Sequence, residues 1–434
     1  MRLPLLFVLG IAIGLVGSLG WAWAAGPVSG AVPTPPTPSS ALPPPQVGTD
    51  GTDGTGSPTS RAPAGGREAE PCVQAPLAAR AQQVLVVGLP GVTDPADPVL
   101  DAMLGDGVGG VFISKANVVG GDQVQALVHA LRDRQEGPLL VTTDEEPGRV
   151  SSFGALLGRT SSARTLAARG EPDEVRAFAH DMGLALAGYG IDANLAPVAD
   201  LDDGPSGGII GDRSFSADPS VATDHTLAFA RGLVDAGVAP TVKHFPGHGR
   251  SRTDSHRELA LVEAPLEVLQ ATDLVPFGAA IDAGVPLVMT GHVAYADIDP
   301  ARPASLATGT YELLREMGFE GVAITDSIGM GAVNLRWPFP EAAVMAIEAG
   351  ADAVLATDGN QTSAMRDALV AAVSDGRLPE ARLDEAAARM VAVSGGDPAS
   401  IVCRVEVDVP TSLLPAAGRQ ARSSQRGAGT ATDE

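Results

Sequence analysis

Residues 236–244 read AGVAPTVKH, and the order of residue types in this stretch decides the fold. An Ala-Gly pair, typical of a helix end, precedes a short β-rich run that finishes in the polar residues Lys243 and His244. The same Ala-Gly pair followed by an apolar run recurs at residues 283–284 and 349–350. This repeated order of helix, glycine and strand predicts βα units in series.

Eight short β-rich runs predict eight strands. They are Val84–Val87, Gly110–Ile113, Leu139–Thr143, Ala193–Ala196, Thr241–His244, Leu287–Thr290, Gly321–Thr325 and Ala353–Ala356. Several are continuous apolar runs, as expected of parallel strands covered on both faces. Eight βα units in about 330 residues predict an α/β fold, a (β/α)8 TIM-type barrel forming a single catalytic domain, with an open doubly wound sheet as the alternative. No Gly-x-Gly-x-x-Gly follows the first run, which disfavours a dinucleotide-binding fold.

The segments between these runs have the periodicity of helices. In one of them the apolar residues recur every three or four positions, at Val175, Phe178, Met182 and Leu186. Residues 266–281 show a similar but less regular spacing, at Leu266, Leu269, Phe277 and Ile281. Each of these two segments therefore predicts a helix with one apolar face.

The chain divides into four parts by composition. Residues 1–25 contain an apolar run that ends in small residues, which predicts a signal peptide or a signal anchor. Residues 26–70 are rich in Pro, Gly, Ser and Thr and predict a disordered linker. The barrel domain is expected over 71–403, and 404–434 is expected to be a disordered tail. We therefore expect an exported protein, either secreted or anchored at the outer face of the cytoplasmic membrane.

The charge and the cysteine content limit the partners. A formal net charge of −23 argues against nucleic acid and against anionic membrane surfaces, so membrane contact is expected only through the N-terminal segment. We expect a monomer. Cys72 and Cys403 are the two cysteines, and in an exported protein we predict that they form a disulfide; two unrelated thiols are the alternative.

Polar residues follow the predicted strands where an active site of a barrel would lie, at the carboxyl ends. They include Asp144, Asp200, Lys243, His244, His292 and Asp326. After the fifth strand the chain reads FPGHG and then DSH, and the Pro-Gly pair makes this segment a loop. A metal-dependent hydrolase using His244, His248, Asp254 and His256 is one alternative, but Pro246 prevents the helix that would bring the first two histidines together. We predict neither a metal nor another cofactor.

Four motifs resemble a known enzyme family. KHFPGHG at 243–249, DSH at 254–256, GDRSF at 211–215 and TDSIGM at 325–330 are similar to glycoside hydrolase family 3, in its β-N-acetylhexosaminidase branch. The resemblance covers roughly residues 84–393. It implies a retaining β-N-acetylglucosaminidase that removes terminal non-reducing β-GlcNAc from small carbohydrates, such as GlcNAc–MurNAc muropeptides of peptidoglycan or chitobiose-like fragments.

The resemblance also implies a role for each site residue. Asp326 corresponds to the catalytic nucleophile; a helix N-cap is the alternative, and the position after an apolar strand favours the catalytic role. His256 corresponds to the acid/base, with Asp254 orienting its ring, where the alternative is a solvated surface pair. Asp144, Arg149, Arg213, Lys243 and His244 correspond to residues that hold sugar hydroxyls, or else stiffen the barrel mouth. His248 and His292 are expected to contact these residues without contacting the sugar; a buried, hydrogen-bonded structural histidine is the alternative for each.

The sequence departs from the family at residues 145–148, which read EEPG where QEGG is usual. Three other functions remain alternatives: a β-N-acetylglucosaminide phosphorylase, a broader β-glucosidase and a non-catalytic sugar-binding module of the envelope. The joint presence of Asp326, Asp254 and His256 favours an enzyme over the binding module.

Overall fold

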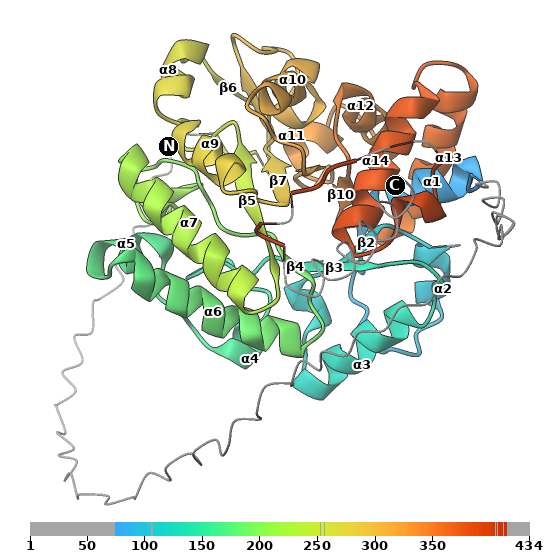
Figure 1. The fold of residues 1–434 in the computed structure, drawn as a ribbon, viewed down its shortest axis with the longest axis horizontal. Helices are drawn as coiled ribbons and strands as arrows, with labels where there is room; N and C mark the ends of the chain where they lie inside the picture. Colours follow the sequence, from blue (N-terminus) through green and yellow to red (C-terminus); the bar gives the residue numbers. More distant parts are fainter. Residues whose placement is uncertain are drawn as a thin grey trace, which may run out of the picture. The chain divides into compact units, whose positions relative to one another are not determined.

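Eight parallel strands form the centre of the fold in the computed structural model (Figure 1). They are β1 (Leu85–Gly88), β2 (Gly110–Ile113), β3 (Leu140–Thr143), β4 (Ala193–Asn194), β5 (Ala239–Phe245), β7 (Leu287–Thr290), β9 (Val322–Thr325) and β10 (Val354–Ala356). Their order in the sheet is β10-β1-β2-β3-β4-β5-β7-β9. A parallel bridge between Ile324 and Ala353, with the Thr325 amide donating to the Ala353 carbonyl at 3.0 Å, connects β9 to β10. The sheet is thus a nearly closed barrel, which confirms the predicted fold class.

The structure describes residues 74–105, 107–251, 253–255, 257–403, 405, 407–410 and 412–414. The predicted signal segment, the predicted linker, Cys72 and His256 lie outside these residues. No described helix is both long enough and apolar enough to cross a membrane.

All eight predicted strands are present; β2 and β7 have the predicted bounds, and the ends of the other six differ from the predicted ones by at most two residues. The continuous apolar runs have the expected cause, because neighbouring residues of a strand pack on opposite faces of the barrel. On β1, Val86 belongs to the cluster inside the barrel, whereas Leu85 and Val87 belong to the cluster between the barrel and the helices. On β2, Phe112 is part of the inner cluster and Val111 of the outer one.

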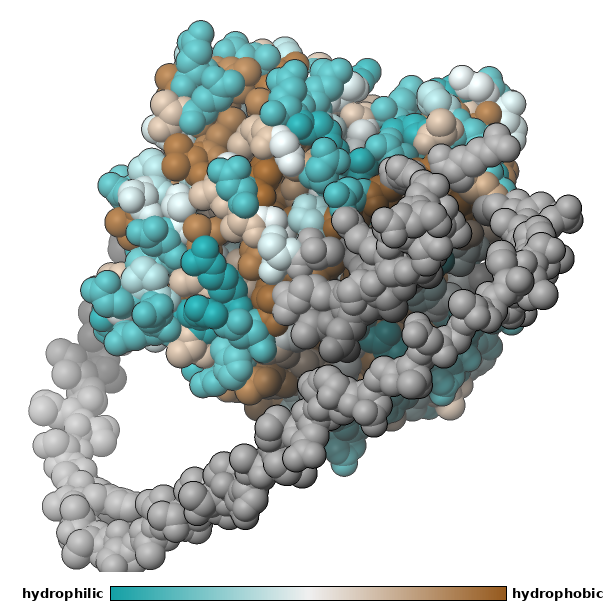
Figure 2. All heavy atoms as spheres, in the orientation of Figure 1, coloured by the Kyte–Doolittle hydropathy of each residue, from teal (hydrophilic) through white to brown (hydrophobic). Residues whose placement is uncertain are grey.

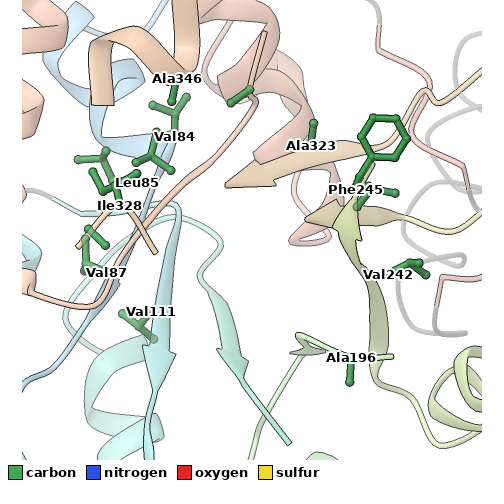
Figure 3. Packing of buried hydrophobic residues seen from close by; sticks show 14 of the residues in the cluster. Val84, Leu85, Val87, Val111, Ala196, Val242, Phe245, Ala323, Ile328 and Ala346 are labelled. Carbon is green, nitrogen blue, oxygen red and sulfur yellow. The ribbon is translucent and has the colours of Figure 1, made fainter. Parts of the chain in front are cut away.

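The helices surround the barrel (Figure 1). They are α1 (Leu77–Gln83), α2 (Val99–Leu104), α3 (Gly121–Arg132), α4 (Gly154–Leu157), α5 (Ala163–Arg169), α6 (Pro172–Gly188), α7 (Pro219–Asp235), α8 (Leu266–Ala271), α9 (Val275–Asp282), α10 (Thr308–Glu316), α11 (Gly331–Asn334), α12 (Phe339–Ala349), α13 (Thr362–Ser374) and α14 (Glu380–Val393). Figure 2 shows hydrophilic residues along the outer parts of α5, α7 and α8, with hydrophobic residues between the helices. The outer cluster lies beneath them, and Figure 3 shows several of its members, including Leu85, Val87 and Val111.

Two predictions about helices have different outcomes. The Ala-Gly pairs do end helices, and Gly237 and Gly284 have positive φ angles of 90° and 78°, a backbone conformation that favours glycine. The segment 266–281, however, is two helices and not one. Pro276 occupies the first turn of α9, where its missing amide is tolerated, and therefore starts a new helix.

A short two-stranded parallel pair outside the barrel was not predicted. It consists of β6 (Ala260–Val262) and β8 (Val293–Tyr295), which pair from Ala260 with Val293 to Val262 with Tyr295. Three-residue strands carry too little periodicity to be recognised in a sequence. The pair matters for function because β6 ends the loop that begins after β5.

The two ends of the domain meet. The Ala75 amide donates to the Ile401 carbonyl at 3.0 Å, and Arg80 of α1 forms ion pairs with Glu380 and Asp384 of α14. This arrangement places Ala75 beside Ile401 and α1 beside α14. The predicted disulfide stays a prediction, because Cys72 is outside the described residues.

The predicted boundary at residue 403 falls too early. Val409, Leu413 and Leu414 are buried, although we assigned them to a disordered tail. Leu414 belongs to the cluster that fills the barrel, and the Ser412 hydroxyl donates to the Ala283 carbonyl at 2.9 Å. A few apolar residues are enough to dock this segment, even though its composition resembles that of a tail.

Candidate active site

A cavity of about 440 Å³ opens at the carboxyl ends of the strands. Its charged and polar walls include Asp144, Arg213, Lys243, His244, His248, Ser255 and Asp326. Its apolar walls include Phe112, Leu195, Met289, Met330 and Leu355. A cavity of this size with few convergent polar groups fits a small ligand such as one or two sugar rings.

Two cations and two carboxylates interlock on one wall. Lys243 of β5 places its Nζ 2.6 Å from Asp144 Oδ1 and 2.6 Å from Glu146 Oε1. Arg213 forms two hydrogen bonds to the Glu146 carboxylate, from Nε to Oε2 at 2.8 Å and from Nη2 to Oε1 at 2.7 Å. Because these charges compensate one another, the wall can be buried without a net charge. Side chains held in this way have fixed positions from which to bind hydroxyl groups.

The charges of this wall shift its pKa values. Burial raises the pKa of the Glu146 carboxyl, but Arg213 and Lys243 outweigh burial and hold this pKa far below its usual range. Burial lowers the pKa of Lys243, and the Asp144 and Glu146 carboxylates raise it by more. Glu146 and Lys243 are therefore both charged at neutral pH.

Asp200, which follows β4, orients two histidines. The His244 Nδ1–H donates to Asp200 Oδ2 at 2.6 Å, which turns Nε2 toward Arg213 Nη2 at 3.4 Å. The His248 backbone amide donates to Asp200 Oδ1 at 2.7 Å. Burial raises the pKa of Asp200, but the histidines and the hydrogen bonds that it accepts lower this pKa below its ordinary value. Asp200 is thus a fixed, ionised anchor behind the cavity.

Asp326 lies immediately after β9 and reaches the cavity. The Ser327 amide donates to Asp326 Oδ1 at 2.7 Å, and no other hydrogen bond engages this carboxylate within the described residues. Burial raises the pKa of Asp326, but His292, His244, the Ser327 amide and Lys243 together hold the pKa below its ordinary value. The carboxylate is ionised near neutral pH, as a nucleophile must be.

His292 supports the segment that carries Asp326. Its Nε2–H donates to the Ser327 carbonyl at 2.8 Å, and its Nδ1 lies 2.7 Å from Ser305 Oγ. The ring is buried and does not line the cavity. His292 therefore contacts the segment that carries Asp326 at Ser327, and its supporting role stays a prediction.

Arg149 does not line the cavity. Its Nε lies 3.0 Å from Asp212 Oδ1, and its Nη2 donates to the carbonyls of Gly208, Ile209 and Ile210. These contacts fix the loop that leads to Arg213. The structure thus brings four of the five predicted sugar-binding residues together and gives Arg149 a different set of contacts.

The loop after β5 carries the predicted Asp254–His256 pair. Asp254 is partly exposed, and its Oδ2 lies 3.6 Å from Arg257 Nε. His256 is outside the described residues, so its approach to Asp326 stays a prediction. Ser255, between them in the chain, is buried and lines the cavity. The loop therefore contributes to the cavity at Ser255.

The structure gives contacts at the site to three residues for which the sequence predicted no individual role. Glu146 and Asp200 hold cations and histidines in place, and Ser255 forms part of the cavity wall. Glu146 and Asp200 follow predicted strands, which was the available signal, but their partners are far away in the sequence. Glu145 is buried and accepts hydrogen bonds from the Ser151 hydroxyl at 2.6 Å and the Phe153 amide at 2.7 Å, so the departure from the family serves the shape of this loop.

Within the described ranges, no group of three or more His, Cys, Asp and Glu residues is arranged to hold a metal ion. His244 and His248 are instead engaged with Asp200, and His248 also lies 3.1 Å from Ser255. The cavity thus places an ionised carboxylate, Asp326, beside buried polar groups that are fixed by their mutual contacts. The fold and the site define a barrel-type glycoside hydrolase.

Comparisons with known proteins give the family. The model of the "Glycosyl hydrolase family 3 N terminal domain" matches residues 79–393. The beta-hexosaminidase LpqI of Mycobacterium tuberculosis is 38% identical over 269 residues, which cover 60% of this chain and 69% of that protein. The chain belongs to glycosyl hydrolase family 3.

Two solved structures agree with this assignment. A family 3 glycosyl hydrolase of Mycobacterium smegmatis superposes with a TM-score of 0.67 at 38% identity, over 73% of this chain and 98% of that one. A family 3 beta-N-acetylglucosaminidase of Paenibacillus sp. superposes with a TM-score of 0.68 at 32% identity, over 79% of this chain and 66% of that one. The barrel and the enzyme class are therefore those expected from the motifs.

Proposed function

We propose that this protein is a retaining β-N-acetylglucosaminidase that releases terminal non-reducing β-GlcNAc through a covalent intermediate on Asp326. One observation carries the proposal: a single cavity brings the ionised Asp326 carboxylate together with Asp144, Arg213, Lys243 and His244. The names of the relatives, beta-hexosaminidase and beta-N-acetylglucosaminidase, support GlcNAc as the sugar.

The first step forms the glycosyl-enzyme. An Asp326 oxygen attacks the anomeric carbon while the bond to the leaving oxygen breaks, and that oxygen takes a proton from His256. Oδ1 is held by the Ser327 amide, so the carboxylate enters the reaction with a fixed orientation. Asp254 orients the His256 ring and stabilises its charge.

The second step releases the sugar. Water attacks the same carbon, gives its proton to His256, and breaks the bond to Asp326, which returns as a carboxylate. Two inversions at one carbon retain its configuration. Asp144, Arg213, Lys243 and His244 bind the sugar hydroxyls in both steps, because their mutual contacts keep them in place when the leaving group departs.

We further propose that the natural substrates are GlcNAc–MurNAc fragments of peptidoglycan and that the protein is exported. The apolar N-terminal run supports export. Release of GlcNAc from GlcNAc–MurNAc, compared with release from chitobiose, tests the substrate. Detection of the mature protein outside the cytoplasm tests the location.

Turnover of an aryl β-N-acetylglucosaminide, compared with the matching aryl β-glucoside, tests the activity and the sugar together. We expect turnover of the first and little of the second. Asp326→Gly should abolish the reaction, and a fluorinated GlcNAc donor that traps the intermediate should label the peptide containing Asp326. Near-native turnover by Asp326→Gly would contradict the mechanism. Faster turnover on adding phosphate, with formation of a sugar phosphate, would indicate a phosphorylase.

A further inference from the structure

The loop between β5 and β6 is anchored at both of its ends on β8. At its start, the Tyr295 hydroxyl of β8 donates to the Gly247 carbonyl at 2.7 Å. At its end, β6 pairs with β8 through Ala260 and Val293. Tyr295 is buried, so the first of these contacts is shielded from water. The ends are therefore fixed, and the position of the middle depends on other contacts.

Ser255 supplies contacts to two different walls of the cavity. Its hydroxyl lies 3.1 Å from His248 Nε2, and its carbonyl accepts from the Ala332 amide at 3.0 Å. His248 is held in turn by Asp200, through its backbone amide. Ala332 lies in α11, which follows Asp326 by a few residues. Ser255 thus connects the loop to the histidine wall on one side and to the nucleophile segment on the other.

The contact between Ser255 and His248 is buried. Both side chains are largely excluded from water, and His248 Nδ1 has no hydrogen-bond partner in the described part of the chain. Burial lowers the pKa of His248 to about 4, so its ring is neutral at neutral pH and can share one proton with the serine hydroxyl. Removing the hydroxyl leaves a buried ring with neither nitrogen bonded, which is unfavourable.

We propose that Ser255 is a positioning residue, which sets the place of its chain neighbours Asp254 and His256 by binding His248 and Ala332. The inference rests on the proposed function, in which that pair is the acid/base. Adjacent residues are about 3.8 Å apart along the backbone, so a shift of Ser255 moves both neighbours. A displacement of about 1 Å is enough to reduce a proton transfer or an attack strongly.

The test is the dependence of the rate on the leaving group. Ser255→Ala should reduce kcat/KM about 10-fold or more for phenyl β-N-acetylglucosaminide, whose poor leaving group needs a proton. For the 2,4-dinitrophenyl glycoside, which needs none, the reduction should be less than about 3-fold. In a His256→Ala background, Ser255→Ala should cause no further leaving-group-dependent loss, because the two changes act on one proton transfer.

Ser251→Ala is the matched control. Ser251 lies in the same loop, and its hydroxyl donates to the Thr253 carbonyl at 3.0 Å and not to a group of the cavity. For the Ser251→Ala variant, the ratio of kcat/KM for the phenyl glycoside to kcat/KM for the 2,4-dinitrophenyl glycoside should stay at the wild-type level. The proposal is wrong if Ser255→Ala lowers kcat/KM equally for the two substrates. It is also wrong if Ser251→Ala changes the ratio of the two kcat/KM values as much as Ser255→Ala does.

Hydrogen exchange gives a readout that does not depend on turnover. In Ser255→Ala the peptide spanning 329–336 should exchange faster than in the wild type, because the Ala332 amide loses protection. Unchanged exchange would overturn the positioning role even if the activity fell. The wild-type turnover of the aryl N-acetylglucosaminide tests the proposed function separately: absence of turnover overturns both proposals, whereas turnover with an unchanged leaving-group ratio in Ser255→Ala overturns this one alone.

Discussion

Glu146 and Arg213 form a two-point ion pair inside the cavity wall, with exposed side-chain fractions of only 1% and 11%. Glu341 and Arg377 form another two-point ion pair on the surface, through Nη1 and Nη2 of the arginine, with exposed fractions of 42% and 41%. The two pairs differ mainly in their contact with water. Buried charges depend on their protein partners for compensation, whereas surface charges are solvated whether paired or not.

We expect Glu146→Gln to lower the free energy of unfolding by about 3 kcal/mol, because it leaves Arg213 and Lys243 with less compensating charge. Glu341→Gln should lower it by less than about 1 kcal/mol. Urea denaturation at neutral pH measures both values. Equal effects of the two substitutions would contradict the account of this wall.

The difference between wild type and Glu146→Gln should depend on pH. The folded-state pKa of Glu146 lies below its unfolded value of about 4.3, so its contribution to stability is present above that value and is lost as the pH falls through the folded pKa. The two unfolding free energies should therefore converge in acid. A constant difference from neutral to acid pH would indicate a purely steric effect.

The pH profile of the enzyme should reflect Asp326. Because the pKa of this carboxylate is held below its ordinary value, it should stay ionised down to mildly acidic pH. The fall of kcat/KM on the acid side of the pH profile should therefore occur only at low pH. His292→Gln removes a ring that lowers this pKa, so the acid limb should move to higher pH. The 2,4-dinitrophenyl glycoside is the suitable substrate, since its departure needs no acid. An unmoved acid limb would show that His292 does not act through Asp326.

Arg149 should act on the loop at residues 208–212 and not on the sugar directly. Arg149→Ala removes its contacts with Asp212 and three carbonyls, so hydrogen exchange over 203–216 should increase and KM should rise. The exposed Arg159 offers a control, because Arg159→Ala should change neither. A higher KM with unchanged exchange would instead favour direct contact with the substrate, as the family resemblance implies.

The predicted disulfide between Cys72 and Cys403 would close a loop around nearly the whole domain. The contact between Ala75 and Ile401 brings the adjoining segments together, which supports the pairing. Closing so long a loop stabilises the folded state by about 5 kcal/mol at most, so reductant should lower the melting temperature of the wild type but not of Cys72→Ser. Alkylation of both thiols without reductant, detected by mass spectrometry, would rule the disulfide out.

The sequence by itself determined the eight strands, their order along the chain and the segment of each predicted site residue, and it favoured a barrel over an open sheet. These features depend on local signals: an apolar run for a strand, an Ala-Gly pair for a helix end, and polar residues directly after a strand. Asp326, Lys243 and His244 could be placed at strand ends for this reason. Family motifs then supplied their expected roles, which no local pattern contains.

Only the tertiary structure decided which of these residues act on one another. Asp200 binds His244 and His248, Glu146 binds Arg213, and Ser255 binds His248, although most of these partners are distant in the sequence. The contacts of Arg149 outside the cavity and the burial of Val409, Leu413 and Leu414 likewise depend on residues that are distant in the sequence. Such contacts depend on where the closed barrel brings its loops together in space. Burial strengthens a polar contact that is formed and makes an unpaired polar group unfavourable. A pattern confined to neighbouring residues contains neither kind of information.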